Sequence, residues 1–303
     1  MKLESNATVN RKITLSLEGR AALWAFLGVL IFSFTLPLTR IAAPEIGGFT
    51  IGIGRAIIAA LLAGAVLYLR REAFPQRKYW RGLALVAFGV VFGFPVFSSI
   101  ALQFVDASHG SVINGLLPAA SAVAAVIFTR ERPQWTFWVV CAAGVVAAVL
   151  YGISRGAGQL QAGDLLMLAA VFMAAIGYAE GGRLSRELEG WRVISWALVF
   201  AAPVMVLTLP IALATHPFAP TPLGWLAFLY VSVFSMYLGF FAWYKGLSMG
   251  SIAKTGQVQL IQTPLTLLWS GLLLGEHLDP VTLAAGGFMV CVALLSRFTR
   301  VRR

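Results

Sequence analysis

Long apolar segments separated by short polar connections fill most of the chain. Each is longer than a typical soluble β-strand, and most reach the roughly 20 residues with which an α-helix crosses a bilayer. The pattern therefore predicts an all-α integral membrane protein with ten transmembrane helices, preceded by a polar tail at residues 1–20. The predicted helices lie at about residues 21–42, 45–69, 80–103, 108–128, 134–152, 164–185, 191–214, 222–243, 252–273 and 280–298.

Composition supports this interpretation and excludes a soluble monomer. Of the 303 residues, 59% are hydrophobic and only 12% are charged, about half of the roughly 25% found in a typical soluble domain. Ten spans of about 20 residues leave about 100 residues for connections, which is too few for a separate soluble domain. The first apolar segment is too long for the core of a signal peptide, so we expect it to be retained.

The basic residues are distributed unevenly between alternate connections. The net charge is +11, and twenty of the 23 lysines and arginines fall on one side, in every second connection and in both tails, including the C-terminal tail 299–303. Of the remainder, Arg155 alone lies in the opposite connections. Because cytoplasmic loops are enriched in Lys and Arg, both termini are predicted to be cytoplasmic, in a bacterial inner membrane. The charge then serves topology, and no nucleic-acid partner is expected.

The chain contains two related halves. Gly19–Glu45 aligns with Gly163–Glu189 at an offset of 144. Five helices per half is an odd number, so the two halves enter the membrane from opposite sides. Inverted repeats of this kind are typical of alternating-access transporters, whose substrate site lies at the repeat interface near the midplane. The predicted repeats span residues 21–152 and 164–298.

Two stretches of sequence and one tryptophan carry a resemblance to a known family. They are Tyr178–Arg186, Pro264–Glu276 and Trp191. The chain resembles the drug/metabolite transporter superfamily over its whole length, specifically its ten-helix EamA-type exporters, and most of all bacterial exporters of aromatic amino acids and methyl viologen. The resemblance implies an exporter of small organic solutes rather than an enzyme. Short motifs in this superfamily mark the fold more than the cargo, so neither Glu131 nor Glu276 is assigned a functional role.

Polar residues form one stripe on each of two predicted helices, with members recurring at helical spacings of three and four. A polar helix face inside a bilayer must meet protein, cargo or water. The stripes therefore line a central cavity or, alternatively, join the two helices by hydrogen bonds worth about 0.6 kcal/mol each. The stripes are Ser111, Asn114, Pro118 and Ser121 on the fourth helix, and Gln259, Thr263, Thr266 and Ser270 on the ninth.

Aromatic residues occupy matching positions on the third and eighth predicted helices. An aromatic lining suits an apolar or aromatic cargo through ring stacking and cation–π contacts, and the alternative is packing against lipid or within the core. At an offset of 142, the residues Phe88, Phe92, Pro95 and Ser99 correspond to Tyr230, Phe234, Tyr237 and Phe241. The candidate substrate-binding residues are Ser33, Phe92, Ser99, Asn114, Tyr178, Tyr237, Gln259 and Thr263.

Three ionisable residues lie at or within predicted membrane helices, where a central charge costs at least about 2.5–3.5 kcal/mol. Arg55 lies near mid-depth and is a candidate for holding a substrate carboxylate or for bonding neighbouring carbonyls structurally. Glu180, three residues before Arg183, is a candidate for a salt-bridged gate or a proton-coupling carboxylate. His109, beside Asp106, is interpreted as an interfacial cap or a proton relay.

Four prolines interrupt predicted helices at depth. Proline removes a backbone hydrogen bond and kinks a helix. These residues are candidate gating or hinge positions, with static kinks that shape the cavity as the alternative. They are Pro37, Pro95, Pro118 and Pro264.

The remaining chemistry favours transport over its rivals. The sequence has neither a His-Glu-x-x-His motif nor a phosphate-binding Gly-x-x-x-x-Gly-Lys-Ser/Thr motif, and Cys141 and Cys291 lie in apolar segments. No catalytic residue, metal or cofactor is therefore expected. The resemblance implies export of amino acids, aromatic and other neutral ones, and of related metabolites, and the stripes add only that the cavity is aromatic and neutral-polar. The alternatives are export of cationic drugs, transport of nucleotide-sugars or other metabolites and, more distantly, an intramembrane enzyme or a channel subunit. A pair of five-helix repeats encloses its own cavity, so a monomer is sufficient.

Overall fold

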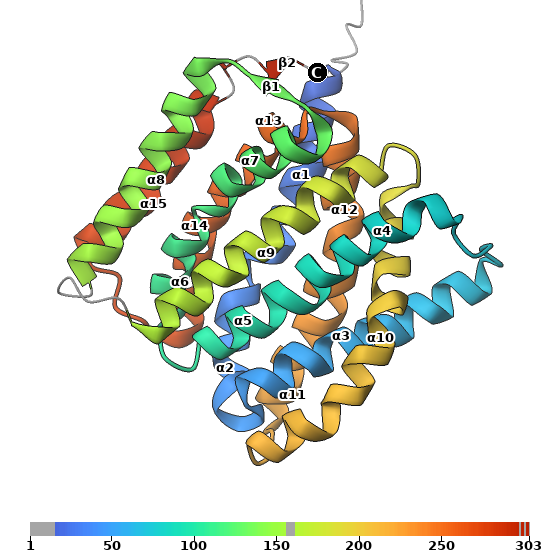
Figure 1. Cartoon of the computed structure of the whole chain (residues 1–303). Coiled ribbons are helices and arrows are strands. Elements are labelled where there is room, and N and C mark those ends of the chain that lie inside the picture. Colours follow the sequence, from blue (N-terminus) through green and yellow to red (C-terminus); the bar gives the residue numbers. More distant parts are fainter. Residues whose placement is uncertain (1–15, 156–160, 297, 300, 303) are drawn as a thin grey trace, which may run out of the picture.

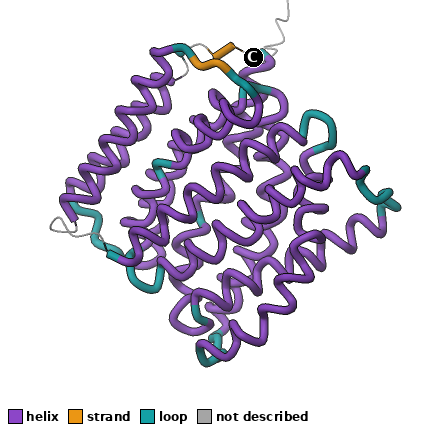
Figure 2. The backbone as a smooth tube through the Cα atoms, in the orientation of Figure 1, coloured by secondary structure: helices purple, strands orange, loops and turns teal. Residues whose placement is uncertain are grey.

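The computed structural model describes residues 16–155, 161–296, 298–299 and 301–302, and nearly all of them are helical (Figures 1 and 2). Residues 1–15 of the predicted N-terminal tail lie outside the described residues, as do residues 300 and 303 of the C-terminal tail.

The first half of the chain forms five spans, three of which are interrupted. The first span is α1 (Leu17–Ser33) and α2 (Thr35–Ile46), the second is α3 (Gly48–Leu69), the third is α4 (Arg77–Val86), η1 (Ala87–Gly93) and α5 (Phe94–Ala101), the fourth is α6 (Ala107–Asn114) and α7 (Leu117–Thr129), and the fifth is α8 (Trp135–Arg155).

The second half forms five more. The sixth span is α9 (Ala162–Leu184), the seventh is α10 (Gly190–Thr215), the eighth is α11 (Pro222–Tyr230), η2 (Val231–Leu238) and α12 (Gly239–Met249), the ninth is α13 (Ile252–Gly256), η3 (Gln257–Ile261) and α14 (Gln262–Leu274), and the tenth is α15 (Pro280–Ser296). Two short strands, β1 (Arg132–Pro133) and β2 (Val301–Arg302), pair antiparallel.

The lengths of these helices confirm the predicted ten-span membrane fold. Seven helical stretches are long and apolar enough to cross a bilayer, and α8 and α15 are shorter apolar helices. The one remaining span, the ninth (Ile252–Leu274), is divided among α13, η3 and α14.

The described ends of the chain lie on one face of the bundle, which we call the terminal face (Figure 1). Lys254 at the start of α13 forms an ion pair with Glu18 at the start of α1, with Nζ 3.1 Å from Oε2. On the same face, β2 near the end of the chain pairs with β1, which follows α7. An even number of spans requires this arrangement.

Two of the three interruptions in the first half recur at corresponding places in the second half, whereas the break between α1 and α2 has no counterpart in the continuous α9. The third span contains the π-helical segment η1 and the eighth contains the π-helical segment η2. The fourth span breaks between α6 and α7, and the ninth breaks at the 3-10 segment η3. π-Helical turns are rare in proteins, and those that occur are often found at functional sites. Helix interruptions at membrane depth are tolerated where the backbone is buried in protein or lines a cavity.

The four predicted hinge prolines differ in one respect from the expected kinks within continuous helices. Each lies in the first turn of a helix that begins after an irregularity: Pro37 in α2, Pro95 in α5, Pro118 in α7 and Pro264 in α14. Proline is well tolerated in the first turn of an α-helix. The segments η1 and η3 run directly into α5 and α14, where the Phe94 N–H donates to the Gly89 carbonyl and the Gln262 N–H to the Gln259 carbonyl. The prolines therefore mark where a new helical segment begins.

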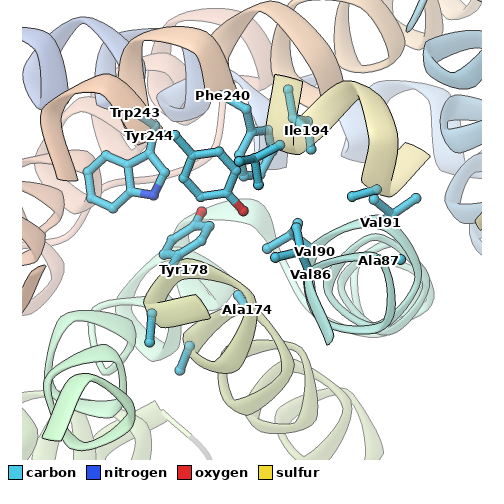
Figure 3. Packing of buried hydrophobic residues seen from close by; sticks show 14 of the residues in the cluster. Val86, Ala87, Val90, Val91, Ala174, Tyr178, Ile194, Phe240, Trp243 and Tyr244 are labelled. Carbon is cyan, nitrogen blue, oxygen red and sulfur yellow. The ribbon is translucent and has the colours of Figure 1, made fainter. Parts of the chain in front are cut away.

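Glycines bring several spans into close contact. A Cβ atom at Gly246 in α12 would lie 2.6 Å from the backbone nitrogen of Ala25 in α1. A Cβ at Gly181 in α9 would lie 2.3 Å from the ring of Tyr244. Beside these contacts, buried side chains of the third, sixth, seventh and eighth spans form a continuous apolar core (Figure 3).

Candidate functional site

A small cavity of about 20 Å³ lies where the two repeats meet, and we call it the central pocket. Three spans of each half line it, and η1, η2 and η3 each contribute a residue. The third, eighth and ninth spans thus lose regular α-helical geometry where they reach the pocket, as discontinuous transporter helices do, whereas Arg55 and Tyr178 lie in the continuous helices α3 and α9. The lining residues are Phe32, Thr35, Arg55, Val90, Phe94, Tyr178, Ser235, Phe240, Gln259 and Gln262.

Arg55 supplies a positive charge to the central pocket. Its side chain is 2% exposed, and its Nε and Nη1 atoms have no hydrogen-bond partner among the residues that the structure describes. A buried charge without a partner is costly. The structural interpretation of Arg55 required bonds to neighbouring carbonyls, and no such bond to Nε or Nη1 is present within the described chain.

Two polar clusters share the pocket with Arg55. The Thr35 and Ser235 hydroxyls share a hydrogen bond at 2.6 Å, so these residues satisfy each other. Gln259 donates from Nε2 to Gln262 Oε1 at 3.3 Å, while Gln259 Oε1 has no partner in the described part of the chain. The pocket therefore presents an unsatisfied acceptor together with the unsatisfied donors of Arg55.

Aromatic rings form one wall of the pocket. Phe32 lies against Phe240 with ring centroids 5.0 Å apart. The Tyr178 ring lies 6.0 Å from Phe240 and 5.1 Å from Trp243, and Figure 3 shows these three rings gathered with Tyr244. A ligand in the pocket would meet ring faces and edges on this side.

Three of the residues singled out from sequence line the central pocket, namely Tyr178, Gln259 and Arg55. Among the other pocket residues, Val90 and Ser235 lie in the two π-helical segments, 145 positions apart. The starts of α4 and α11 are also 145 positions apart, so the offset of 142 taken from the sequence for these two spans is wrong. This repeat equivalence is a signal that the sequence contained. It was hidden because neither residue stands out on its own helix.

Two other predicted substrate-binding residues hold helices together. Ser33 Oγ accepts from Trp269 Nε1 at 2.9 Å, and the Ser33 carbonyl accepts from Thr266 Oγ1 at 2.9 Å. Thr263 Oγ1 donates to the Ser111 carbonyl at 3.2 Å. These contacts correspond to the alternative in which the polar stripes join helices.

The remaining four candidates are not among the lining residues. Phe92 stacks on Phe88, whose side chain is 49% exposed at the periphery. The Tyr237 hydroxyl shares a hydrogen bond with Ser195 Oγ at 2.9 Å. Ser99 and Asn114 are buried, and their side-chain Oγ and Oδ1 have no partner among the described residues.

The other predicted charges are paired. Arg183 donates from Nε and Nη2 to the two oxygens of Glu180 at 2.9 and 2.6 Å. His109 Nε2 forms a hydrogen bond with Asp164 Oδ1 at 2.8 Å, at the start of α9. Asp106, which lies beside His109 in the sequence, forms an ion pair with Arg40. In the described residues, no three His, Cys, Asp or Glu side chains group in a way that could hold a metal ion.

Comparison with known proteins identifies the family. The model of the EamA-like transporter family matches residues 19–153 and 161–298. A Bacillus subtilis (strain 168) protein, uncharacterized transporter YdeK, is 42% identical over 279 residues, which are 91% of this chain and 96% of the relative.

More distant relatives carry more specific names. A probable terminal-alkyne amino-acid exporter of Streptantibioticus cattleyicolor is 24% identical, covering 93% of this chain and 95% of the relative. An S-adenosylmethionine/S-adenosylhomocysteine transporter of Chlamydia muridarum is 25% identical, covering 93% of each chain. A solved crystal structure superposes with a TM-score of 0.72 at 17% identity, covering 92% of this chain and 98% of that one, and shows the fold alone. The chain therefore belongs to the EamA-like transporter family and is a multi-pass membrane transporter, not an enzyme.

Proposed function

We propose that this transporter exports amino acids, aromatic and other neutral ones, and related small metabolites that carry a carboxylate. Transport proceeds by alternating access through the central pocket, across a bacterial inner membrane with the terminal face in the cytoplasm. The observation that carries this proposal is the buried guanidinium of Arg55, whose Nε and Nη1 have no hydrogen-bond partner within the described chain.

Arginine is suited to bind a carboxylate. Its planar group presents N–H donors in a fixed fork that matches the two oxygens of a carboxylate, giving paired charge-assisted hydrogen bonds. A bound carboxylate would supply the partner that Arg55 lacks among the described residues. The cost of the buried charge would then be recovered only when cargo is present.

The other walls complete a site for an α-amino acid. Gln259 Oε1 has no hydrogen-bond partner among the described residues, so it is free to accept from an ammonium group. Phe32, Tyr178 and Phe240 offer ring contacts to an apolar or aromatic side chain. The cavity, about 20 Å³, has room for about one water molecule, so an amino acid would enter it only after the lining spans move apart.

The relatives support the same chemical class. Two of them are named for an amino acid and for S-adenosylmethionine or S-adenosylhomocysteine. All of these molecules carry an α-amino group and a carboxylate. The shared element is the one that Arg55 and Gln259 would bind.

Two alternative cargoes fit less well. A cationic drug would place its charge near the unpaired guanidinium of Arg55, where like charges repel. A nucleotide-sugar diphosphate would call for several cations, whereas Arg55 is the single Lys or Arg among the residues lining the central pocket.

The test is uptake of labelled phenylalanine, methionine and threonine into proteoliposomes, with and without an imposed pH gradient. We expect flux of at least one of them. Flux without a gradient would establish a facilitative carrier, and flux only with a gradient would establish proton coupling. Flux of cationic compounds alone, from folded protein, would contradict the proposal.

Arg55 provides the matched variants. Arg55→Lys keeps the charge but loses the fork, so we expect a KM raised about tenfold or more. Arg55→Gln removes the charge and should abolish saturable flux. Normal uptake by both variants would remove Arg55 from the site.

A further inference from the structure

Two glutamates join the fourth and ninth spans at their ends. Glu131 follows α7, and its two carboxylate oxygens accept hydrogen bonds from the backbone N–H groups of Ile252 and Ala253 at 2.9 and 3.0 Å. Glu276 follows α14, and its oxygens accept from the N–H groups of Ala107 and Ser108, both at 2.9 Å. Each carboxylate thus caps the helix that begins beside it by accepting from its first two backbone N–H groups.

The two contacts are the same contact in the two inverted repeats. Glu131 and Glu276 are 145 positions apart, and so are Ala107 and Ile252, and Ser108 and Ala253. The residues before the glutamates, Arg130 and Gly275, both end their helices in the left-handed conformation, with φ of 55° and 66°. This shared turn directs both carboxylates across to the opposite repeat.

The two contacts lie on opposite faces of the membrane domain. Glu131 binds the start of α13, which lies on the terminal face beside the start of α1. Glu276 binds the start of α6, at the far end of the fourth span (Figure 1). With both contacts formed, Arg55, Tyr178 and Gln259 in the central pocket are all at most 5% exposed.

The two contacts differ in strength. Glu131 is 1% exposed and accepts two further hydrogen bonds, from Ser251 Oγ at 2.9 Å and from Arg186 Nη2 at 3.0 Å. Charge-assisted bonds of this kind are the stronger ones in proteins. Glu276 is only half-buried. The contact on the terminal face is therefore the harder one to break.

We propose that Glu131 and Glu276 are the two latches of alternating access. Release of Glu276 opens the central pocket to the face opposite the termini, and release of Glu131 opens it to the terminal face. The stronger Glu131 latch makes the empty transporter open first on the Glu276 side. This inference rests on the proposed alternating access, and it is independent of which cargo is carried.

The test measures access to the pocket from each face without any cargo. The reporter is Thr35→Cys, a pocket residue, in a protein whose Cys141 and Cys291 are replaced by alanine. Labelling by a membrane-impermeant maleimide is timed from each face in oriented proteoliposomes. Glu276→Gln should raise labelling from the opposite face about tenfold, and Glu131→Gln should do so from the terminal face, because each loses a charge-assisted contact.

A second variant removes a donor in place of the carboxylate. Ala107 is the first residue of α6, where proline is well tolerated, and Asp106 before it has the extended backbone that precedes proline. Ala107→Pro deletes one N–H that Glu276 accepts, so it should change labelling in the same direction as Glu276→Gln.

Two other glutamates that join the repeats serve as controls. Glu45 binds Thr221 on the opposite face, and Glu72 binds Arg192 on the terminal face, and neither belongs to the fourth or ninth span. Glu45→Gln and Glu72→Gln should leave the labelling rates unchanged.

Three results would overturn the latches: unchanged labelling in both Gln variants, equal increases from both faces, or the same effect in the controls. Side-specific labelling without amino-acid flux would leave the latches standing and remove the proposed cargo. Amino-acid flux with unchanged labelling would support the proposed cargo and remove the latches.

Discussion

Ser111 and Thr263 exchange hydrogen bonds across the fourth and ninth spans. Ser111 Oγ donates to the Thr263 carbonyl at 3.3 Å, and Thr263 Oγ1 donates to the Ser111 carbonyl at 3.2 Å. Both residues belong to the polar stripes, and both side chains are buried. At this level the stripes fasten one repeat to the other.

Thr263→Val should therefore lower stability while leaving transport nearly intact. Loss of one interhelical hydrogen bond in a membrane protein costs about 0.6 kcal/mol on average and about 1.7 at most. The matched control is Thr208→Val, because Thr208 Oγ1 donates only locally, to Val204 and Met205 carbonyls of its own helix. Thermal unfolding in detergent and uptake per folded protein are the measurements. A tenfold loss of uptake from stable Thr263→Val protein would return Thr263 to the transport pathway.

Gln259 and Asn114 are 145 positions apart in the two repeats, yet only Gln259 lines the central pocket. We predict that Gln259→Met lowers kcat/KM about tenfold or more, since it removes the acceptor for cargo. Asn114→Leu should keep most of the uptake. Equal losses in the two variants, measured with protein of equal folded yield, would show that the repeats contribute symmetrically.

The number of spans was predictable because bilayer thickness sets the length of an apolar helix. The positions of η1 and η2 were not, because an extra residue in a helical turn leaves no mark in a pattern of apolar residues. The four prolines came close, since each begins a helix after an irregularity. Proline fixes the start of a helical segment but does not reveal the geometry before it.

The site was predictable only in part. Arg55 stood out because an isolated charge at depth is expensive, and Tyr178 and Gln259 stood out as polar groups on apolar helices. Thr35 and Ser235 did not, because their role depends on a mutual hydrogen bond between residues 200 positions apart. Thr263 and Ser33 were predicted to bind substrate but join helices instead. Sequence could not separate the two roles, because a polar stripe has the same period whether it faces a cavity or another helix.

Close packing between α1 and α12 gives a prediction about stability. Gly246→Ala would place Cβ 2.6 Å from the backbone nitrogen of Ala25, forcing the two helices apart. We expect a loss of about 1–3 kcal/mol, as for other overpacked sites. Gly64→Ala is the control, because a Cβ there meets no described atom within 4 Å. It should be neutral or slightly stabilising, since alanine favours helix. Equal melting temperatures would contradict the tight contact.

The ion pair of Glu180 with Arg183 argues for a structural role. Both carboxylate oxygens accept hydrogen bonds from Arg183, and Glu180 is 4% exposed. We predict that Glu180→Gln lowers the folded yield, because it breaks an ion pair whose carboxylate is buried, but leaves unchanged the ratio of uptake with and without a pH gradient. A change in that ratio would make Glu180 a coupling residue.

The buried charge of Arg55 should lower the stability of the fold while being required for uptake. Its guanidinium is buried, and Nε and Nη1 have no hydrogen-bond partner among the described residues. Replacing Arg55 therefore removes a desolvated charge and breaks no hydrogen bond to these two nitrogens within the described chain. Replacing a buried ion pair by apolar side chains of similar volume is often neutral or stabilising, by about 1–4 kcal/mol, and a lone buried charge also carries the cost of desolvation. We therefore expect Arg55→Met to unfold at a higher temperature than the parent protein while losing uptake. A ligand that binds the folded state raises its melting temperature, so added phenylalanine or methionine should stabilise the parent but not the variant. A lower melting temperature in Arg55→Met would mean that the charge supports the fold, and stabilisation of both proteins by the amino acid would place the carboxylate elsewhere.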